Sequence, residues 1–147
     1  MHVHRRALVL GLVFGLLGTP TSSFADTGVI EWNESSRRAL AIGRELNRPV
    51  LIYIQASRCG HCRKMENTTW SDPAVVRVVT EGFVPLKIDG EQNSAWLDRF
   101  DIQGFPAVIV LSTSGEVVFH VEGYRSPKEI LRRLNDAARP SASMTRR

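Results

Sequence analysis

The chain contains two cysteines, Cys59 and Cys62, and only Gly60 and His61 separate them. A disulfide that closes so short a loop constrains the unfolded chain little, by about 2 kcal/mol compared with about 4.7 kcal/mol for a loop of 100 residues. A pair retained for stability would lie farther apart in the sequence. The spacing favours instead two thiols that open and close a disulfide as part of a reaction.

Cys59 is predicted to lie at the amino end of a helix, because an apolar run precedes it and a helical pattern follows it. Unpaired N–H groups and the helix dipole favour an anion at that position. In motifs of this kind the thiol pKa falls from about 8.5 to between about 3.5 and 7.5. We therefore expect Cys59 to be the attacking sulfur. Basic side chains nearby favour its thiolate further, and they are Arg58, His61, Arg63 and Lys64.

Cys62 lies one helical turn after Cys59 and is expected to be less exposed. It would resolve a mixed disulfide by attacking Cys59 and releasing the reduced substrate. Arg58, Gly60 and His61 are candidates for tuning the pair. A protonated His61 would stabilise the thiolate, which exists only in the reduced form, and would raise the reduction potential. A solvent-exposed histidine without a role is the alternative.

Paired cysteines also bind zinc or cuprous copper. A structural zinc site usually needs four protein ligands, and beyond residue 25 the only histidines are His61 and His120. His61 cannot easily share one tetrahedral ion with both flanking cysteines, and His120 falls in a predicted strand. We assign no metal ligands and expect no cofactor. Capture of cuprous copper by the two thiolates stays an open alternative.

Residues 1–25 have the layout of a signal peptide. Two arginines precede the apolar run 7–18, which is shorter than the roughly 20 residues that span a bilayer. Small residues at positions 23 and 25 then mark a cleavage site before Asp26. An uncleaved membrane anchor is the alternative. In both cases the rest of the chain is expected in an exported, oxidising compartment, which we take to be the periplasm.

The remaining 122 residues suit one domain with a core of its own. Without the two arginines of the leader, 17 Lys and Arg stand against 15 Asp and Glu. So small an excess does not indicate a nucleic-acid-binding protein. We expect residues 26–138 to form the domain, as a monomer, and residues 139–147 to be a disordered basic tail.

Apolar runs alternate with helical patterns and predict the order α-β-α-β-α-β-β-α, in which the second helical element consists of two segments. Strands 50–54 and 83–88 are apolar almost throughout, which is typical of strands buried on both faces. Capping residues followed by proline predict helix starts at Asp72 and Ser126, and Glu129 completes a capping box with Ser126. The other expected helices are 35–47, 60–67 and 91–100, and the other expected strands are 107–111 and 116–122.

Several motifs together resemble the thioredoxin superfamily, from about Trp32 to Ala138. The resemblance is to exported thioredoxin-like proteins similar to the reductive thioredoxin domain of bacterial thiol:disulfide interchange proteins, while the dipeptide between the cysteines is similar to that of protein disulfide isomerase. It implies an α/β, three-layer thioredoxin fold with a central mixed β-sheet flanked by helices. The motifs are the strand before Cys59-Gly60-His61-Cys62, Val84-Pro85-Leu86-Lys87-Ile88-Asp89, Phe100-Asp101-Ile102-Gln103-Gly104-Phe105-Pro106 and the hairpin Gly115-Glu116.

The resemblance implies a protein thiol–disulfide oxidoreductase, leaning toward reduction. Its expected partners are exported protein substrates with thiols or disulfides and a membrane electron donor. The resemblance also implies that Pro106 is cis and that Phe105 and Pro106 position the substrate, whereas the sequence alone indicates an ordinary proline at a strand start. Two other functions stay open: a disulfide oxidant or isomerase, and a non-catalytic thioredoxin-like module that binds a partner or handles copper.

The sequence departs from the family pattern at two positions. Arg58 replaces the tryptophan that is common just before the first cysteine, so substrate contacts and local charge will differ. Tyr53 replaces the buried acid that many thioredoxins keep six positions before that cysteine, so no base is inherited for the second thiol. Glu66, one turn beyond Cys62, could act through water, but a solvated carboxylate is its simpler interpretation, and Lys87 is interpreted as structural.

Overall fold

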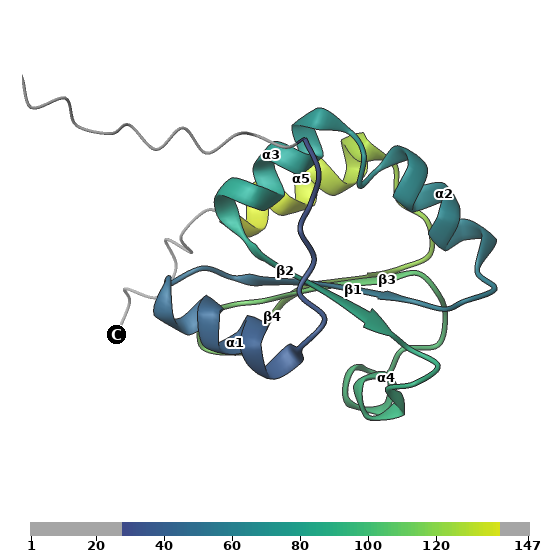
Figure 1. Ribbon diagram of the computed structural model, residues 1–147, viewed down its shortest axis with the longest axis horizontal. Helices are drawn as coiled ribbons and strands as arrows, with labels where there is room; N and C mark the ends of the chain where they lie inside the picture. Colours follow the sequence, from purple (N-terminus) through teal and green to yellow (C-terminus); the bar gives the residue numbers. More distant parts are fainter. Residues whose placement is uncertain (1–27, 139–147) are drawn as a thin grey trace, which may run out of the picture.

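The computed structural model describes residues 28–138 (Figure 1). The expected signal peptide at residues 1–25 and the expected basic tail at residues 139–147 lie outside the described residues. Between residues 28 and 138 no helix is both long and apolar enough to cross a membrane.

Four strands form one mixed sheet in the order β2-β1-β3-β4. β1 (Val50–Gln55) and β2 (Val84–Asp89) are parallel. β3 (Ala107–Leu111) runs antiparallel to β1, and β4 (Val117–Glu122) runs antiparallel to β3. The mixed sheet predicted from the sequence is therefore confirmed.

Within residues 28–138, five helices cover the two faces of this sheet. α2 (Gly60–Thr68), α3 (Pro73–Gly82) and α5 (Pro127–Ala138) lie over one face. α1 (Ser36–Glu45) and α4 (Ser94–Phe100) lie over the other (Figure 1). The described chain thus has the three layers that the sequence predicts.

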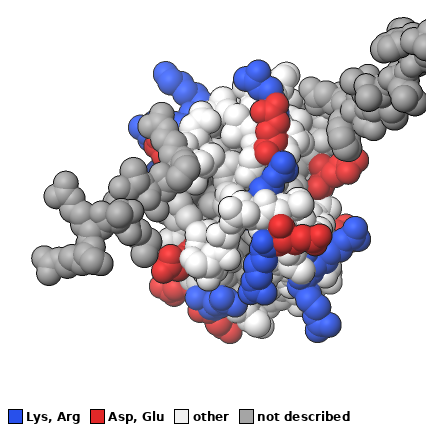
Figure 2. Space-filling view, turned by 90° about the vertical axis from the view of Figure 1, so that its left-hand side faces the viewer, with Lys and Arg blue, Asp and Glu red and all other residues white. Residues whose placement is uncertain are grey.

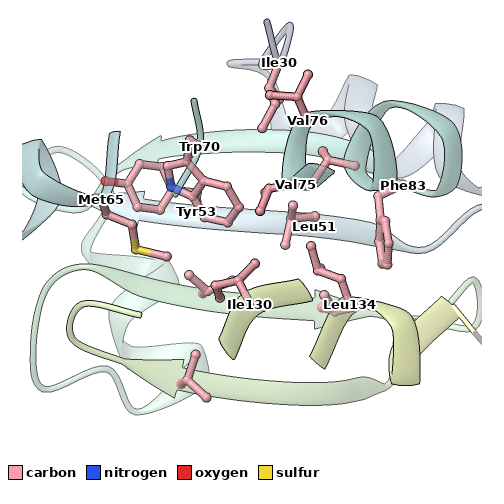
Figure 3. Packing of buried hydrophobic residues seen from close by; sticks show 14 residues of the cluster. Ile30, Leu51, Tyr53, Met65, Trp70, Val75, Val76, Phe83, Ile130 and Leu134 are labelled. Carbon is pink, nitrogen blue, oxygen red and sulfur yellow. The ribbon is translucent and has the colours of Figure 1, made fainter. Parts of the chain in front are cut away.

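Strand β1 connects both layers because its successive side chains point to opposite faces. Leu51 and Tyr53 pack among residues of α2, α3 and α5, as Figure 3 shows. Val50, Ile52 and Ile54 pack against the side of α1 and α4. All five side chains are at most 3% exposed, which confirms that this strand is buried on both faces. The carboxyl end of β1, which leads to the cysteines, therefore projects from a strand that is buried on both faces.

Side-chain caps begin three helices where the sequence indicates them. Asp72 accepts hydrogen bonds from two backbone N–H groups of the first turn of α3, directly before Pro73. Ser126 and Glu129 form the expected capping box, in which the carboxylate accepts from the Ser126 N–H at 2.9 Å and its hydroxyl at 2.7 Å. These bonds lower the pKa of Glu129. Ser35 caps α1.

Two predicted elements differ from the structure. Helix α4 begins at Ser94 and not at residue 91, because residues 90–93 form a turn that Asp89 holds. The Asp89 carboxylate accepts from the Glu91 N–H and from the Gln92 side-chain amide, each at 2.9 Å. The prediction that the second strand is buried on both faces was also wrong. β2 lies at an edge of the sheet, so its residues alternate between buried and partly exposed.

Candidate active site

Cys59 and Cys62 form a disulfide at the amino end of α2, with an S–S distance of 2.10 Å and a Cα–Cα distance of 5.1 Å. Cys59 is the N-cap residue, and its Sγ accepts a hydrogen bond from the Cys62 N–H at 3.0 Å. Cys59 is partly exposed, whereas Cys62 is 1% exposed. An external sulfur can therefore reach Cys59 but not Cys62.

The surroundings of Cys59 favour a negative charge on its sulfur when the disulfide is open. The sulfur already sits where the helix N–H groups point, and the first turn of α2 contains no acidic residue. Arg58 and His61 flank it and are exposed. Gly60 has open space around it, since a Cβ there would meet no atom within 4 Å. Packing therefore does not require a glycine at this position.

Tyr53 lies beneath the second cysteine. Its hydroxyl donates a hydrogen bond to the Cys62 carbonyl at 3.3 Å, and its side chain is fully buried. The ring packs against Trp32 and Trp70, with centroid distances of 5.6 and 5.4 Å. Burial raises the pKa of the Tyr53 hydroxyl, and the charge of Glu66 raises it further. Tyr53 is therefore a neutral hydrogen-bond donor here, not a base.

Glu66 and Lys87 form an ion pair beside Tyr53. The Lys87 Nζ lies 2.5 Å from the Glu66 Oε1 and 5.8 Å from the centroid of the Tyr53 ring. The Lys87 side chain is 32% exposed and the Glu66 side chain is 34% exposed. Glu66 and Cys62 are four residues apart in α2, and residues at this spacing lie on the same helix face. A carboxylate is thus close to the buried thiol, although it comes from α2 and not from β1.

A pocket of about 320 Å³ opens at the edge of the sheet and is lined by Lys87, Gln55 and Asp89. Trp32 and Trp96 form its aromatic walls. Because Lys87 contacts both this pocket and Glu66, solvent reaches the ion pair from the side of β2.

The peptide bond between Phe105 and Pro106 is cis, as the resemblance implies. Pro106 is buried and directly precedes β3, whose first residue, Ala107, pairs with Ile54 of β1. Since Ile54 shortly precedes Cys59, this pairing brings Pro106 to the end of the sheet where the cysteine motif begins. The Pro106 carbonyl accepts from the Gly123 N–H at 2.7 Å, which fixes the segment to the end of β4.

The loop after β2 contacts both segments that flank the disulfide. The Glu91 carboxylate accepts from the Ser57 N–H at 3.2 Å and from its hydroxyl at 2.5 Å. These bonds lower the pKa of Glu91, and Arg58 contributes a smaller lowering. On the other side, the Phe105 ring packs so closely on Gly90 that a Cβ there would lie 2.5 Å from it. The loop thus fixes the positions of the segments before Cys59 and before Pro106.

Between residues 28 and 138, no three His, Cys, Asp or Glu side chains lie close enough together to bind a metal ion. His61 lies on α2, whereas His120 lies on β4. The His120 Nε2 lies 3.4 Å from the Glu122 Oε1.

A model of the thioredoxin-like domain matches residues 37–138. The chain belongs to this family. Thiol:disulfide interchange protein DsbD of Ralstonia nicotianae is 33% identical over 114 residues, which cover 74% of this chain. Protein disulfide-isomerase A4 of Bos taurus is 29% identical over 92 residues, which cover 63% of this chain. A solved thioredoxin from Thermus thermophilus matches with a TM-score of 0.67 at 25% identity, covering 74% of this chain and 86% of that one.

These matches confirm the thioredoxin fold. The chain spans only 18% of the length of the DsbD relative and 14% of the isomerase, so the similarity concerns one thioredoxin-like domain of each. Within the thioredoxin-like domain, the Cys-X-X-Cys disulfide lies at the amino end of α2.

The sequence interpretation missed two contacts of this thioredoxin-like site. It treated Glu66 and Lys87 separately, although Lys87 is the strand partner of Tyr53 and Glu66 follows Cys62 by one turn. Pairing the two predicted parallel strands residue by residue would have brought Lys87 next to the site. The contact of Glu91 with Ser57 was harder to predict from the sequence. Its only indication is that both residues follow the carboxyl ends of parallel strands, which meet at one edge of the sheet.

Proposed function

We propose that the protein exchanges disulfides with other exported proteins through Cys59 and Cys62, mainly as a reductase. The observation that carries this proposal is the asymmetry of the pair. One sulfur is accessible at the amino end of α2, and the other is buried one turn later. Cys59 is the nucleophile and Cys62 the resolving residue, while Phe105 and Pro106 position the substrate.

The reaction has two steps. In the reduced protein, the Cys59 thiolate attacks a substrate disulfide, a Cys59–substrate bond forms, and the second substrate sulfur leaves with the electron pair and takes a proton. Cys62 then loses its proton and attacks the Cys59 sulfur, which releases the other substrate sulfur as a thiolate. The substrate has gained two electrons, and the protein disulfide has formed. The reverse sequence donates that disulfide.

Arg58, Gly60 and His61 tune the nucleophile. The guanidinium of Arg58 and a protonated His61 stabilise the Cys59 thiolate, whereas Gly60 leaves space for an approaching chain. At Cys62, Glu66 is the carboxylate one turn away, and Tyr53 cannot take its place because burial raises the Tyr53 pKa. No cofactor takes part in these steps.

The direction of electron flow depends on the reduction potential and on a donor. A reductase in an oxidising compartment needs a membrane electron donor to reopen its disulfide. Equilibration with glutathione measures the potential: a value near about −270 mV supports reduction, and one between about −180 and −120 mV supports oxidation or isomerisation. A potential between about −180 and −120 mV would make the protein a disulfide oxidant or isomerase instead of a reductase.

Insulin reduction by the purified protein with dithiothreitol tests the exchange itself. Cys59→Ser should abolish turnover, because the remaining thiol of Cys62 is buried. Cys62→Ser should stop after one step and accumulate a mixed disulfide, which gel electrophoresis detects without reductant and which identifies the substrates in a cell extract. Absence of turnover in the unmodified protein, together with tight binding of cuprous copper, would refute exchange and favour the copper-handling module.

Export is the part of the proposal that rests on residues 1–25. Expression of the full chain in a Gram-negative host should yield a periplasmic protein whose first residue is Asp26. Retention in the membrane fraction with Met1 intact would instead show the uncleaved anchor. Recovery in the cytoplasm would overturn export without affecting the exchange chemistry.

A further inference from the structure

Four basic side chains lie within five residues of Cys59 in the sequence, and we call them the basic rim: Arg58, His61, Arg63 and Lys64. All four are exposed. Among residues 28–138 none of them belongs to an ion pair, since the pairs found there join Lys87 with Glu66 and His120 with Glu122. The charges of Arg58, Arg63 and Lys64 are therefore not neutralised by a salt bridge among the described residues.

The rim does not stabilise the helix on which it lies. Helix N-termini favour anions by about 0.3–1 kcal/mol each, yet Arg58 precedes α2 and His61 lies in its first turn, where no acidic residue compensates. The Lys64 Nζ lies 4.3 Å from the centroid of the Tyr124 ring. This contact with a neutral ring does not cancel the charge of Lys64. Helix stability therefore does not account for Arg58 and His61 at this helix start.

The opposite end of the molecule is different, because basic and acidic side chains lie side by side there (Figure 2). At the rim the acid that approaches is Glu91. Its carboxylate is engaged by two hydrogen bonds from Ser57, and these bonds, with a smaller effect of Arg58, lower its pKa. Glu91 therefore reduces the positive field on the side of Ser57.

We propose that the basic rim selects a polypeptide in which acidic residues flank the reacting disulfide. This inference rests on the proposed function, because the rim acts only while a substrate sulfur approaches Cys59. Carboxylates on either side of that sulfur would meet Arg58 and Arg63, whose guanidinium groups bind carboxylates through paired N–H donors. The covalent step is unchanged: the Cys59–substrate bond forms, the substrate disulfide breaks, and the leaving sulfur takes the electron pair.

The test compares three synthetic peptides that contain the same internal disulfide, flanked by aspartate, glutamine or lysine. The second-order rate constant for their reduction by the reduced full chain is measured at low and at high salt. At low ionic strength we expect the aspartate peptide to react at least about tenfold faster than the lysine peptide, as is common for steered encounters. At 1 M salt, where the screening length is about 3 Å, most of that ratio should disappear.

Variants separate steering from nucleophilicity. Arg58→Gln combined with Arg63→Gln should lower the ratio of aspartate to lysine rates, even if a change in the Cys59 pKa shifts all three rates together. Glu91→Gln, which keeps a hydrogen-bond acceptor for Ser57, should raise that ratio. Arg77→Gln removes a charge from α3 and should leave it unchanged.

The outcomes are distinct. Equal rates for the three peptides at low salt, or a faster lysine peptide, would refute the acidic substrate class while leaving disulfide exchange intact. Failure to reduce any of the peptides, including the glutamine one, would refute exchange itself, and the substrate class with it.

Discussion

Replacing Gly90 by alanine puts a methyl group where the Phe105 ring now lies. A Cβ at residue 90 would be 2.5 Å from Cε1 and 2.7 Å from Cζ of that ring, and 3.2 Å from the Ile54 Cγ2. Carbon atoms pack best at about 3.5–4.0 Å, so the ring must move by roughly an ångström. Ile54 is fully buried and cannot yield, whereas Phe105 is partly exposed. The Phe105 ring, and not the Ile54 side chain, is therefore expected to shift.

The expected loss of stability combines two opposing effects. Overpacking of this kind costs about 1–3 kcal/mol, and the lower backbone entropy of alanine in the unfolded chain returns about 0.4–1 kcal/mol. We expect Gly90→Ala to lower the free energy of unfolding by about 1–2 kcal/mol. The matched control is Gly82→Ala at the end of α3, where a Cβ meets nothing within 4 Å, and this variant should be as stable as the original or more so.

Urea denaturation of the oxidised protein measures both variants, and the m-value should stay constant if only stability changes. Gly90→Ala should also slow insulin reduction more than Gly82→Ala does, because a displaced Phe105 moves the backbone that positions the substrate. If Gly90→Ala proves as stable as Gly82→Ala, the close packing of Phe105 on this loop is wrong. If Gly90→Ala loses the expected stability but reduces insulin as fast as Gly82→Ala does, Phe105 does not position the substrate.

Three further substitutions test the region around the second cysteine and one helix start. Tyr53→Phe removes the hydrogen bond to the Cys62 carbonyl and should cost about 1 kcal/mol in denaturation at neutral pH. Because burial raises the Tyr53 pKa in the folded state, the folded protein keeps a proton that the unfolded chain loses above pH ~10. Stability should therefore fall as pH rises beyond that point, and less steeply in Tyr53→Phe. Glu66→Gln breaks the pair with Lys87 but should cost less than about 1 kcal/mol, since both partners are about one-third exposed; a larger loss, measured in urea, would contradict that exposure. Ser126→Ala removes the cap of α5 and should cost about 1 kcal/mol, so an unchanged melting curve would refute the capping box.

Elements with local causes could be predicted from the sequence. The burial of β1 on both faces follows from an apolar run long enough for one strand, and the start of α3 follows from Asp72 and Pro73, whose side chain and ring act within one turn. The position of Cys59 at the amino end of α2 follows in the same way, since the helix starts directly after a strand and a short loop. Each of these depends on neighbours only a few residues away.

Contacts between distant segments could not be predicted in this way. Glu66 and Lys87 are 21 residues apart, and Ser57 and Glu91 are 34 apart. Their proximity depends on how α2 lies on the sheet and on the register of β1 with β2, which periodicity does not determine. The wrong start of α4 has a local cause that the helical pattern does not reveal, because the Asp89 carboxylate accepts from the Glu91 N–H and holds a turn. The cis form of Pro106 came from the family resemblance alone.

The surroundings of Cys59 are fixed before a substrate arrives, because three loops hold one another. The Glu91 carboxylate holds Ser57, the Gly90 N–H donates to the Gln55 carbonyl at 2.8 Å, and the Phe105 ring lies on Gly90. A site arranged in this way loses little conformational freedom on binding, so discrimination between substrates depends on the charges it presents more than on loop closure. Substitutions in any of these loops should therefore change exchange rates together, whereas Val117→Thr on the exposed face of β4 should change none of them.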